Sequence, residues 1–368
     1  MEYVIFVLIF SISFCSLRFM NAEKKCAFLI LSLLLVSGCV ALASCSRTGA
    51  AKAEVNSFTA MNTYMTVKAY GKGAAAANLL VQREVERVEK IISTTIEGSD
   101  VYRINSKIGL DIAETFVQPE TAFLIKESQK FYKMTDGAFN PALFLVIREW
   151  GFTTGNYKVP EDGTVRELLA LTDFSEVKID GDCVYHPYGL QLDFGAIGKG
   201  YAGDKAIEIL RAAGVSSALL DFGGNIQVLG SKPDGSDWTV GIKNPWGGDP
   251  VAAVKLRDAC MITSGGYERF FTGEDGKKYI HIFDGKTGRP VDNELESVTI
   301  ICREGLYGDA LSTALFVMGL EKAVTFWQNS ARDFDFVIIT KDKRLVYSAP
   351  LEKSITLLFD FNFVEVVE

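Results

Sequence analysis

Histidine and net positive charge are both scarce in this chain, and each shortage excludes a class of function. Only two histidines, His186 and His281, occur in 368 residues, so a zinc site built from three histidines is excluded. Acidic side chains outnumber basic ones by 46 to 38, which gives a formal charge of −8. Because nucleic-acid binding needs a basic face, this balance argues against a nucleic-acid partner. The hydrophobic content of 48% is ample for a packed core.

Cysteine is sparse beyond the first 45 residues. Only Cys183, Cys260 and Cys302 occur there, widely spaced and without a C-x-x-C motif. An odd number of distant cysteines favours buried free thiols over a disulfide framework or a metal site.

The N-terminus has the features of a targeting segment. Lys24 and Lys25 precede the apolar run CAFLILSLLLVSGCVALASC, which ends in small residues. Two cysteines stand where a bacterial lipoprotein signal would be cleaved, Cys39 in VSGC and Cys45 in LASC. This combination predicts a lipoprotein signal segment, with either cysteine as the site of lipid attachment.

A transmembrane anchor is the alternative interpretation, because Cys26–Ala43 is nearly long enough to span a bilayer. A membrane helix has no need of two cleavage sites, so the lipoprotein interpretation is favoured. We therefore expect a signal over residues 1–45, a polar tether over 46–56 and one folded domain over 57–368.

Hydrophobic periodicity predicts an α+β domain with mixed, mostly antiparallel sheets packed with helices. The patterns indicate helices at Ala74–Ile92, Pro119–Met134, Thr164–Leu171, from the glycine turn at 195–200 to Gly214, and Asp309–Leu320. They indicate strands at Ser57–Tyr70, Glu176–Ile179, Cys183–Tyr185, before the glycine turn, in neighbouring strands SSALLDFGGNIQVLG and DWTVGIKNP, in YIHIF and SVTIIC, and at Phe336–Thr340 and Ile355–Phe359.

The stretch LDFGAIGKGYAGDKA places a glycine-rich turn at the start of a helix. Its pattern, Gly195-x-x-Gly198-Lys199-Gly200, fits neither of the two familiar nucleotide-binding loops. Glycines let backbone N–H groups approach a phosphate, and the helix N-terminus adds a partial positive charge. A plain tight turn is the alternative. Asp193, just before the turn, is either a structural cap or a reader of a ligand N–H edge, because a buried carboxylate must be hydrogen-bonded.

Three further motifs carry polar residues at turns or within strands. In DGAFNPAL, the chain turns after a helix, and its backbone either completes that turn or lines a flat ring. Gly223-Gly224-Asn225 in mid-strand indicates a bulge or a close backbone approach. In HIFDGKTGRP, His281 on a strand precedes Asp284 by three residues, which shifts the balance from a structural histidine towards a base.

The segment GDALSTALFVMGL predicts a helix with several side chains that could bind a metal. Asp309, Ser312 and Thr313 fall at i, i+3 and i+4, so their oxygens share one face, expected at the first turn. Oxygen donors without cysteine or histidine suit Mg²⁺. The alternative is an N-cap with small packing residues.

Taken together, these motifs resemble the ApbE family of flavin transferases. The resemblance runs from about Ser57 to Gly319 and is carried in order by MNTYMTV, TDGAFNP, LDFGAIGKGYAGD, LLDFGGNIQVLG, TSGGYERFF, YIHIFDGKTGRPV and GDALSTALFVMG. It implies an ApbE-like, T-fold-like domain and an enzyme that binds FAD as its substrate together with Mg²⁺. Such an enzyme either attaches FMN by a phosphoester bond to a Thr or Ser of a partner flavoprotein, of the redox-pump subunit type, or releases FMN and AMP to water.

A non-catalytic lipoprotein that binds or stores FAD is the competing interpretation. The metal-type pair Asp309 and Thr313 argues against it, because a carrier needs no metal. With the N-terminal signal, the resemblance places the protein at the periplasmic face of the inner membrane, held by its lipid.

The resemblance also assigns roles residue by residue. The implied cofactor-binding residues are Met61, Asn62, Thr95, the backbone of Ala138, Phe139 and Asn140, Asp193, Lys199 and Ile282. The implied metal site is the carbonyl of Ala196 with Asp309, Ser312 and Thr313, where Ser312 replaces an Asp of some members. His281 is the implied base for the acceptor hydroxyl, at a pKa near its ordinary value, and Asp284 is the alternative base.

The chain departs from the family pattern at three positions. Asn62 stands where a Gly is usual, Thr95 near a position where many members carry a flavin-stacking Tyr, and Gly285 where a Pro is usual. Because an aromatic stack on a base is worth ~1–3 kcal/mol, its loss favours turnover of FAD over retention.

Overall fold

The computed structural model describes residues 52–107 and 112–368. The expected signal over 1–45 and both candidate lipid cysteines, Cys39 and Cys45, lie outside these described residues. The folded unit begins at Lys52, and its first strand starts at Ala53, inside the segment expected as tether. Within the described ranges, no helix has the length and apolar character needed to cross a membrane.

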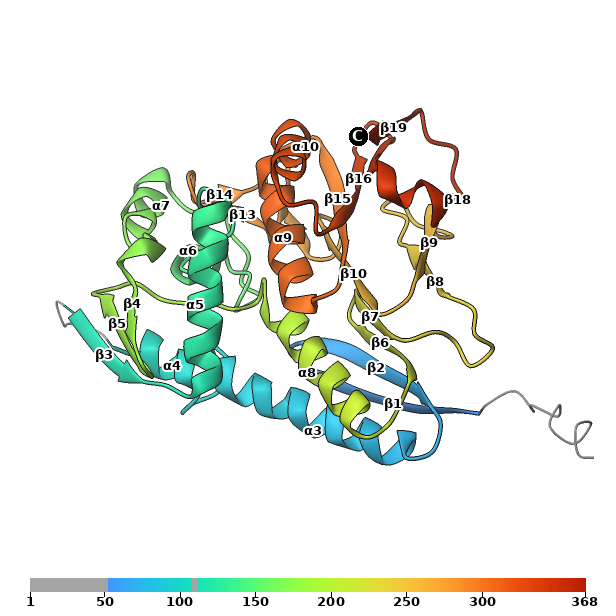
Figure 1. Ribbon diagram of the computed structural model, residues 1–368. Helices are drawn as coiled ribbons and strands as arrows, with labels where there is room; N and C mark the ends of the chain where they lie inside the picture. The colour runs from blue at the N-terminus through green and yellow to red at the C-terminus, as the bar shows by residue number, and fades with distance from the viewer. Residues whose placement is uncertain (1–51, 108–111) are drawn as a thin grey trace, which may run out of the picture. The chain divides into compact units, whose positions relative to one another are not determined.

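A nine-stranded sheet forms the centre of the folded unit (Figure 1). Its order is β1-β2-β6-β7-β10-β15-β16-β17-β19, and only the last pair, β17 with β19, is parallel. The strands are β1 (Ala53–Ala60), β2 (Thr63–Tyr70), β6 (Ser217–Phe222), β7 (Asn225–Leu229), β10 (Ala259–Gly265), β15 (Leu295–Cys302), β16 (Asp335–Thr340), β17 (Arg344–Ser348) and β19 (Phe363–Val367).

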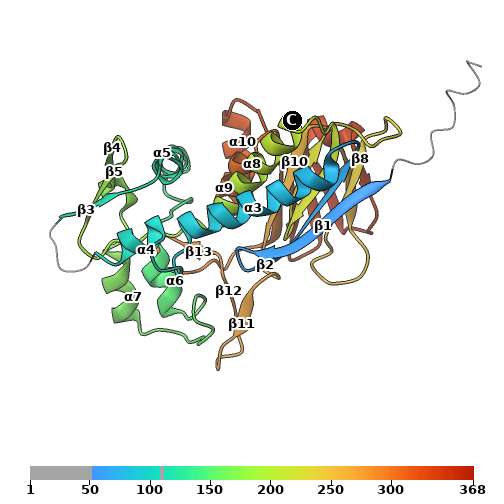
Figure 2. The same ribbon diagram turned by 90° about the horizontal axis from the view of Figure 1, so that it is seen from below.

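Helices cover one face of this sheet, and a small second sheet covers the other (Figure 2). The alternation along β10 shows the division: Ile262 belongs to the core under the helices, and Met261 to the core under the second sheet. The covering helices are α3 (Ala74–Ile92), α8 (Gly198–Ala212), α9 (Gly305–Met318) and α10 (Leu320–Asn329). The second sheet has the order β18-β9-β8, from Ile355–Leu357, Ala252–Leu256 and Trp238–Ile242.

A smaller α+β part precedes α8 in the chain and contains a three-stranded sheet ordered β3-β5-β4. Its elements are α4 (Asp100–Asn105), β3 (Ile112–Phe116), α5 (Pro119–Met134), α6 (Phe144–Glu149), α7 (Asp162–Leu169), η2 (Phe174–Glu176), β4 (Lys178–Asp180) and β5 (Cys183–Pro187). The remaining short elements are β11 (Phe270–Thr272), β12 (Lys278–Ile280), β13 (Phe283–Asp284), β14 (Arg289–Pro290) and η3 (Ala349–Lys353).

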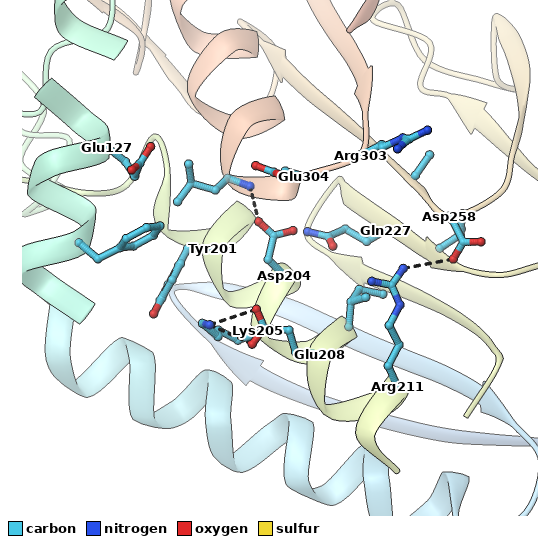
Figure 3. A pocket seen from close by; sticks show the side chains of 15 residues that line it. Glu127, Tyr201, Asp204, Lys205, Glu208, Arg211, Gln227, Asp258, Arg303 and Glu304 are labelled. Atoms are coloured by element: carbon cyan, nitrogen blue, oxygen red, sulfur yellow. Dashed lines mark hydrogen bonds and ion pairs between the residues drawn. The ribbon is translucent and has the colours of Figure 1, made fainter. Parts of the chain in front are cut away.

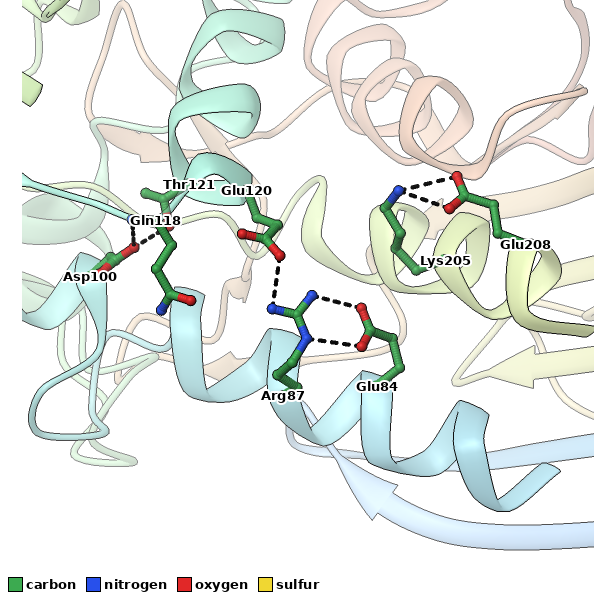
Figure 4. Close-up of polar contacts among 8 residues, drawn as sticks. All are labelled: Glu84, Arg87, Asp100, Gln118, Glu120, Thr121, Lys205 and Glu208. Atoms are coloured by element: carbon green, nitrogen blue, oxygen red, sulfur yellow. Dashed lines mark hydrogen bonds and ion pairs between the residues drawn. The ribbon is translucent and has the colours of Figure 1, made fainter. Parts of the chain in front are cut away.

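Polar contacts join this smaller part to the helices on the sheet (Figure 4). Arg87 on α3 pairs with Glu84 of its own helix at 2.7 Å and with Glu120 at the start of α5 at 2.8 Å.

Within the smaller part, the buried carboxylate of Asp100 accepts hydrogen bonds from the backbone N–H of Gln118 and the hydroxyl of Thr121, each at 2.7 Å. Buried carboxylates bonded in this way hold α4 against α5.

Several expectations from the sequence are confirmed. The helices at Ala74–Ile92 and Pro119–Met134 have the expected bounds, because each carries an apolar stripe and α5 starts with a proline. The fold is α+β with mostly antiparallel sheets. The three cysteines beyond residue 45 are free and buried.

Other expectations are wrong, and turns explain most of them. The segment Ser57–Tyr70 is not one strand, because Met61 and Asn62 form a turn between β1 and β2. Gly223 and Gly224 form a hairpin turn between β6 and β7 and not a bulge within a strand. Both residues have positive φ, as two-residue hairpins with the right twist require. The other expectation for this motif, a close backbone approach, is confirmed, because a Cβ on Gly223 would overlap Thr63.

Two strand predictions fail for other reasons. The residues before the glycine turn, Leu192–Phe194, form no strand. The Leu192 backbone bonds to the Asn105 side chain and the Asp193 N–H to the Pro141 carbonyl, so neither joins a sheet. The segment DWTVGIKNP forms β8 in the second sheet, paired with β9, and is not a neighbour of the β6–β7 hairpin.

Candidate functional site

The turns of two hairpins lie together at one end of the nine-stranded sheet. The β1–β2 turn holds Met61 and Asn62, both with positive φ (49° and 57°), a strained backbone for a side chain as large as methionine. The Met61 N–H donates to Glu89 Oε1 on α3 at 2.7 Å, which holds the turn in place. At the β6–β7 turn, a Cβ on Gly223 would overlap the side chain of Thr63, so the second turn packs directly on the first.

The glycine turn at the start of α8 brings that helix against α9. A Cβ at Gly200 would overlap the Gly305 carbonyl, so only glycine permits this approach. The Gly200 N–H donates to Asp309 Oδ2 at 2.9 Å. This N–H of the helix N-terminus therefore holds a carboxylate of the protein, a favourable place for a negative charge.

The helix α9, which carries Asp309, begins four residues earlier than its sequence pattern indicated. Because it starts at Gly305, Asp309, Ser312 and Thr313 lie beyond its first turn, and the expectation of a first-turn cluster is wrong. Their shared face is nonetheless present. Ser264 at the end of β10 approaches it, with its Oγ 2.9 Å from Ser312 Oγ and 3.2 Å from Thr313 Oγ1.

The start of α9 is held by an aspartate that the sequence patterns did not single out. Asp204 on α8 accepts hydrogen bonds from the backbone N–H groups of Gly305 at 2.6 Å and Leu306 at 2.8 Å. Burial raises the pKa of Asp204 to about 6, although these two bonds act in the opposite direction. The helix has no cap from its own N-cap residue, so a side chain from α8 takes that role.

Asp204 also lines a cleft beside α8, and this cleft is separate from the predicted site. It has a volume of about 300 Å³ and lies between α5, α8 and the ends of β7 and β10. Figure 3 shows the polar ends of Asp204 and Gln227, two of its lining residues, next to each other. Among its lining residues are none of those predicted for cofactor, metal or catalysis.

The loop after α5 connects to the segment before α8. Asp193 donates its N–H to the Pro141 carbonyl at 2.8 Å, and its Oδ1 accepts from the Gly195 N–H at 2.8 Å. The second bond makes Asp193 the cap of its own turn. Burial is the main cause that raises the pKa of Asp193, opposed by the Gly195 bond and by the charges of Arg269 and Lys199.

The loop after α5 also meets the turn that follows His281. Lys286 pairs with Asp136 at 2.5 Å, and a Cβ on Gly285 would lie 3.4 Å from the amide nitrogen of Asn140. Asp284 Oδ1 accepts from the Lys286 N–H at 2.8 Å. The carboxylate of Asp284 therefore stabilises its own turn.

His281 lies between β12 and β13 and not on a strand as expected. Its Nδ1 is 3.1 Å from the Arg269 carbonyl oxygen. Because a carbonyl only accepts, Nδ1 carries the proton and Nε2 presents its lone pair. Burial, followed by the charges of Arg269 and Lys199, lowers the pKa of His281 to about 4. The expectation of an ordinary pKa is wrong, and the imidazole is neutral at pH 7.

The shared electrostatic partners show that the separate motifs meet. Lys199 and Arg269 both act on Asp193 and on His281, so the glycine turn and the HIFDGK segment lie close together. Arg269 lies within the motif TSGGYERFF, but the sequence analysis gave it no role. Its guanidinium donates to the Phe152 carbonyl at 2.6 Å. Ser264 was missed too, although it lies in the same motif.

Several of the predicted residues are buried, and others are exposed. Ser312 is fully buried, and its hydroxyl bonds to the Asp309 carbonyl and to Ser264. Phe139 and Ile282 are buried in the main core. Thr95 is exposed beyond the end of α3, where its backbone bonds to Ser93.

Comparison with known proteins identifies the family. The model of the ApbE family matches residues 61–338. The chain belongs to the ApbE family. The resemblance carried by its motifs is thereby confirmed over most of the chain.

Relatives of this ApbE-family chain cover most of its length. A protein of Treponema pallidum named FAD:protein FMN transferase is 34% identical over 83% of the chain and 89% of its own length. One of Klebsiella pneumoniae with the same name is 32% identical over 79% and 90%. The crystal structure of an ApbE protein from Thermotoga maritima matches at 31% identity and a TM-score of 0.73, covering 79% of this chain and 95% of that one.

The oxygen donors around Asp309 fit a hard divalent cation. They are carboxylate and hydroxyl groups from Asp309, Thr313 and Ser264, the ligand type that Mg²⁺ prefers. Only Oδ2 of Asp309 is bound by Gly200, which leaves Oδ1 for a ligand. In the part of the chain that the structure describes, no cluster of three His, Cys, Asp or Glu side chains offers another metal site.

Proposed function

We propose that this protein cleaves the pyrophosphate of FAD with the help of Mg²⁺ and transfers FMN to the hydroxyl of a Thr or Ser on a partner flavoprotein. When no acceptor is bound, water takes the place of that hydroxyl, and FMN and AMP are released. The names of the relatives, FAD:protein FMN transferase, support the transfer reaction for this chain.

The observation that carries the proposal is the contact between α8 and α9. The hydrogen bond from Gly200 to Asp309 Oδ2, at 2.9 Å, places a carboxylate beside the N-terminus of α8, whose second residue is Lys199. A carboxylate for the cation and a positive environment for the phosphates are the two parts that phosphoryl transfer needs. A protein that only stores FAD needs no such carboxylate.

Mg²⁺, when bound, would neutralise the negative charge that develops on the phosphate oxygens. Asp309 and Thr313 would hold it, with the carbonyl of Ala196 as a further oxygen ligand. The buried Ser312 would support these ligands through Ser264 and the Asp309 carbonyl.

His281 is the base of this proposal. The neutral imidazole directs Nε2 away from the Arg269 carbonyl, so Nε2 accepts the proton of the acceptor hydroxyl. A base with a pKa of about 4 is weak at pH 7, but bound phosphates would raise this pKa because a negative charge favours the imidazolium. Asp284 remains the alternative base.

The N-terminal signal leads us to propose that the protein is lipid-anchored at the periplasmic face of the inner membrane. The lipid attaches to Cys39 or Cys45. The acceptor would then be a membrane flavoprotein with its Thr or Ser target on the same side, of the redox-pump subunit type.

The proposal is tested by incubating the full-length chain, purified in detergent, with FAD and MgCl₂. We expect FMN and AMP to appear in equal amounts by chromatography, and excess EDTA to stop their release. Added membranes from a strain lacking the protein should acquire a covalently flavinylated band, fluorescent in a denaturing gel. Asp292→Ala, at an exposed acid paired with Lys341, is the matched control for Asp309→Ala and should retain full activity. FAD that stays bound and intact with Mg²⁺ present would instead establish a carrier.

A further inference from the structure

Asn225 is a buried polar residue that the proposed function leaves without a role. It follows the Gly223-Gly224 turn as the first residue of β7, and it is only 4% exposed. Its amide nitrogen Nδ2 is buried, and among the described residues it has no hydrogen-bond partner. A buried donor without an acceptor is costly, so a partner in another state of the protein would account for it.

The strand register fixes the height of Asn225 on the sheet. Asn225 is directly opposite Ile262 on β10, and Gln227 is opposite Cys260. Residues two apart on a strand face the same way, and the Gln227 side chain donates to the Gly200 carbonyl at 3.2 Å. Asn225 therefore projects towards the helix face, two residue pairs before Gln227 on β7 and next to the Gly223-Gly224 turn.

The helix α9 runs along the same face in the direction of β10, which is opposite to that of β7. Near its start, the Cys260 Sγ lies 3.5 Å from the Glu304 carbonyl oxygen. Further on, a Cβ on Gly308 would lie 3.1 Å from Ile262 Cδ1, and Ser312 meets Ser264. Because Asn225 pairs with Ile262, its position along the sheet matches that of Gly308 and Asp309 along α9.

Asp309 is the acceptor that this position makes available. It is 4% exposed, and its Oδ2 accepts from Gly200 while Oδ1 is left for a ligand. Outer donors orient a carboxylate that coordinates a cation, and a carboxylate that turns away from the Gly200 N–H to do so would take a second donor in its place or beside it.

We propose that Asn225 is a positioning residue for Asp309: its amide donates to the carboxylate once the carboxylate turns to bind the divalent cation. This inference rests on the proposed function, because it requires that Asp309 bind Mg²⁺. Asn225 itself touches neither FAD nor the cation. In the metal-free protein the unpaired amide lowers the stability. When the metal is bound, the hydrogen bond that the amide gains raises the affinity for the metal.

The experiment replaces Asn225 by leucine, which has a similar size but no polar atom, and uses the full-length chain in detergent. Titration calorimetry measures the dissociation constant of Mg²⁺ alone, and thermal unfolding follows the protein in EDTA. We expect Mg²⁺ to bind about 10- to 100-fold more weakly in Asn225→Leu. In EDTA the melting temperature should be unchanged or higher by a few degrees, because no bond is lost and a buried donor is removed.

Two further variants separate positioning from packing. Asn225→Ala should show the same loss of Mg²⁺ affinity, with the Mg²⁺ concentration for half-maximal activity raised and the KM for FAD unchanged. Ser217→Ala removes another buried, unpaired polar group, at the far end of β6, and should leave the Mg²⁺ affinity as it is.

Two results would overturn the inference. The first is an Asn225→Leu protein that binds Mg²⁺ within two-fold of the parent. The second is a lower melting temperature in EDTA with unaltered Mg²⁺ affinity, which is the behaviour of a merely structural residue. A parent chain that neither binds Mg²⁺ nor cleaves FAD would refute the proposed function as well, whereas normal binding by both proteins refutes only the role of Asn225.

Discussion

Replacing Asp204 by asparagine tests how the start of α9 is held in place. The carboxylate of Asp204 accepts from two backbone N–H groups, those of Gly305 and Leu306, at 2.6 and 2.8 Å. Asparagine has the same shape and keeps one side-chain oxygen as an acceptor, but it cannot ionise. The substitution therefore removes the titration of this group and at most one hydrogen bond.

The magnitude follows from the pKa of Asp204, which burial raises from 3.8 to about 6. Below the ordinary value the carboxyl is protonated in both the folded and the unfolded chain, and its contribution to stability is fully present. As the pH rises through about 6, the unfolded carboxyl ionises more readily than the buried one, and this contribution is lost. At about 1.4 kcal/mol per pKa unit, the loss amounts to about 3 kcal/mol.

Urea unfolding of the parent and of Asp204→Asn, at several values between about pH 4 and about pH 7, measures this effect. The free energy of unfolding of the variant relative to the parent should rise by about 2 kcal/mol over this range, because the unfolded carboxyl is already partly ionised at about pH 4. Asp234→Asn serves as the control, because Asp234 is exposed in a turn and the Ser236 hydroxyl lowers its pKa. Its relative stability should change with the opposite sign. A difference between Asp204→Asn and the parent that does not vary with pH would refute the buried, pKa-shifted carboxyl.

Three further outcomes follow from the site and the N-terminus. His281→Ala should still bind FAD and Mg²⁺ but turn over about 10²- to 10⁴-fold more slowly, measured as FMN release; cleavage within a few-fold of the parent would move the role of base to Asp284. Asp309→Ala should abolish FAD cleavage while circular dichroism reports an intact fold, and full turnover in excess EDTA would contradict the need for a cation. Labelled fatty acid should enter the parent chain, and the lipoprotein assignment is wrong if a Cys39→Ala/Cys45→Ala double variant still incorporates it.

Local patterns in the sequence were sufficient to predict a helix where its apolar residues recur at the helical period and form one buried face. The apolar stripe of Ala74–Ile92 and the proline at the start of Pro119–Met134 predicted both helices with their observed bounds. The ordered series of motifs was sufficient to identify the family. The turn at Met61 was not predicted, because Met61 adopts a positive φ that its side chain disfavours.

Only the tertiary structure decided which of these motifs meet and in what chemical state. The glycine turn before α8 has the composition of a phosphate loop, yet the Gly200 N–H binds Asp309, more than one hundred residues away in the chain. Asp204 and Arg269 lie within the motifs LDFGAIGKGYAGD and TSGGYERFF. Their roles carry no local signal, because a cap for another helix and a charge beside His281 exist only once distant segments pack. The protonation state of His281 was beyond the sequence for the same reason: an imidazole keeps its ordinary pKa of about 6.5 until burial and neighbouring cations penalise its charge.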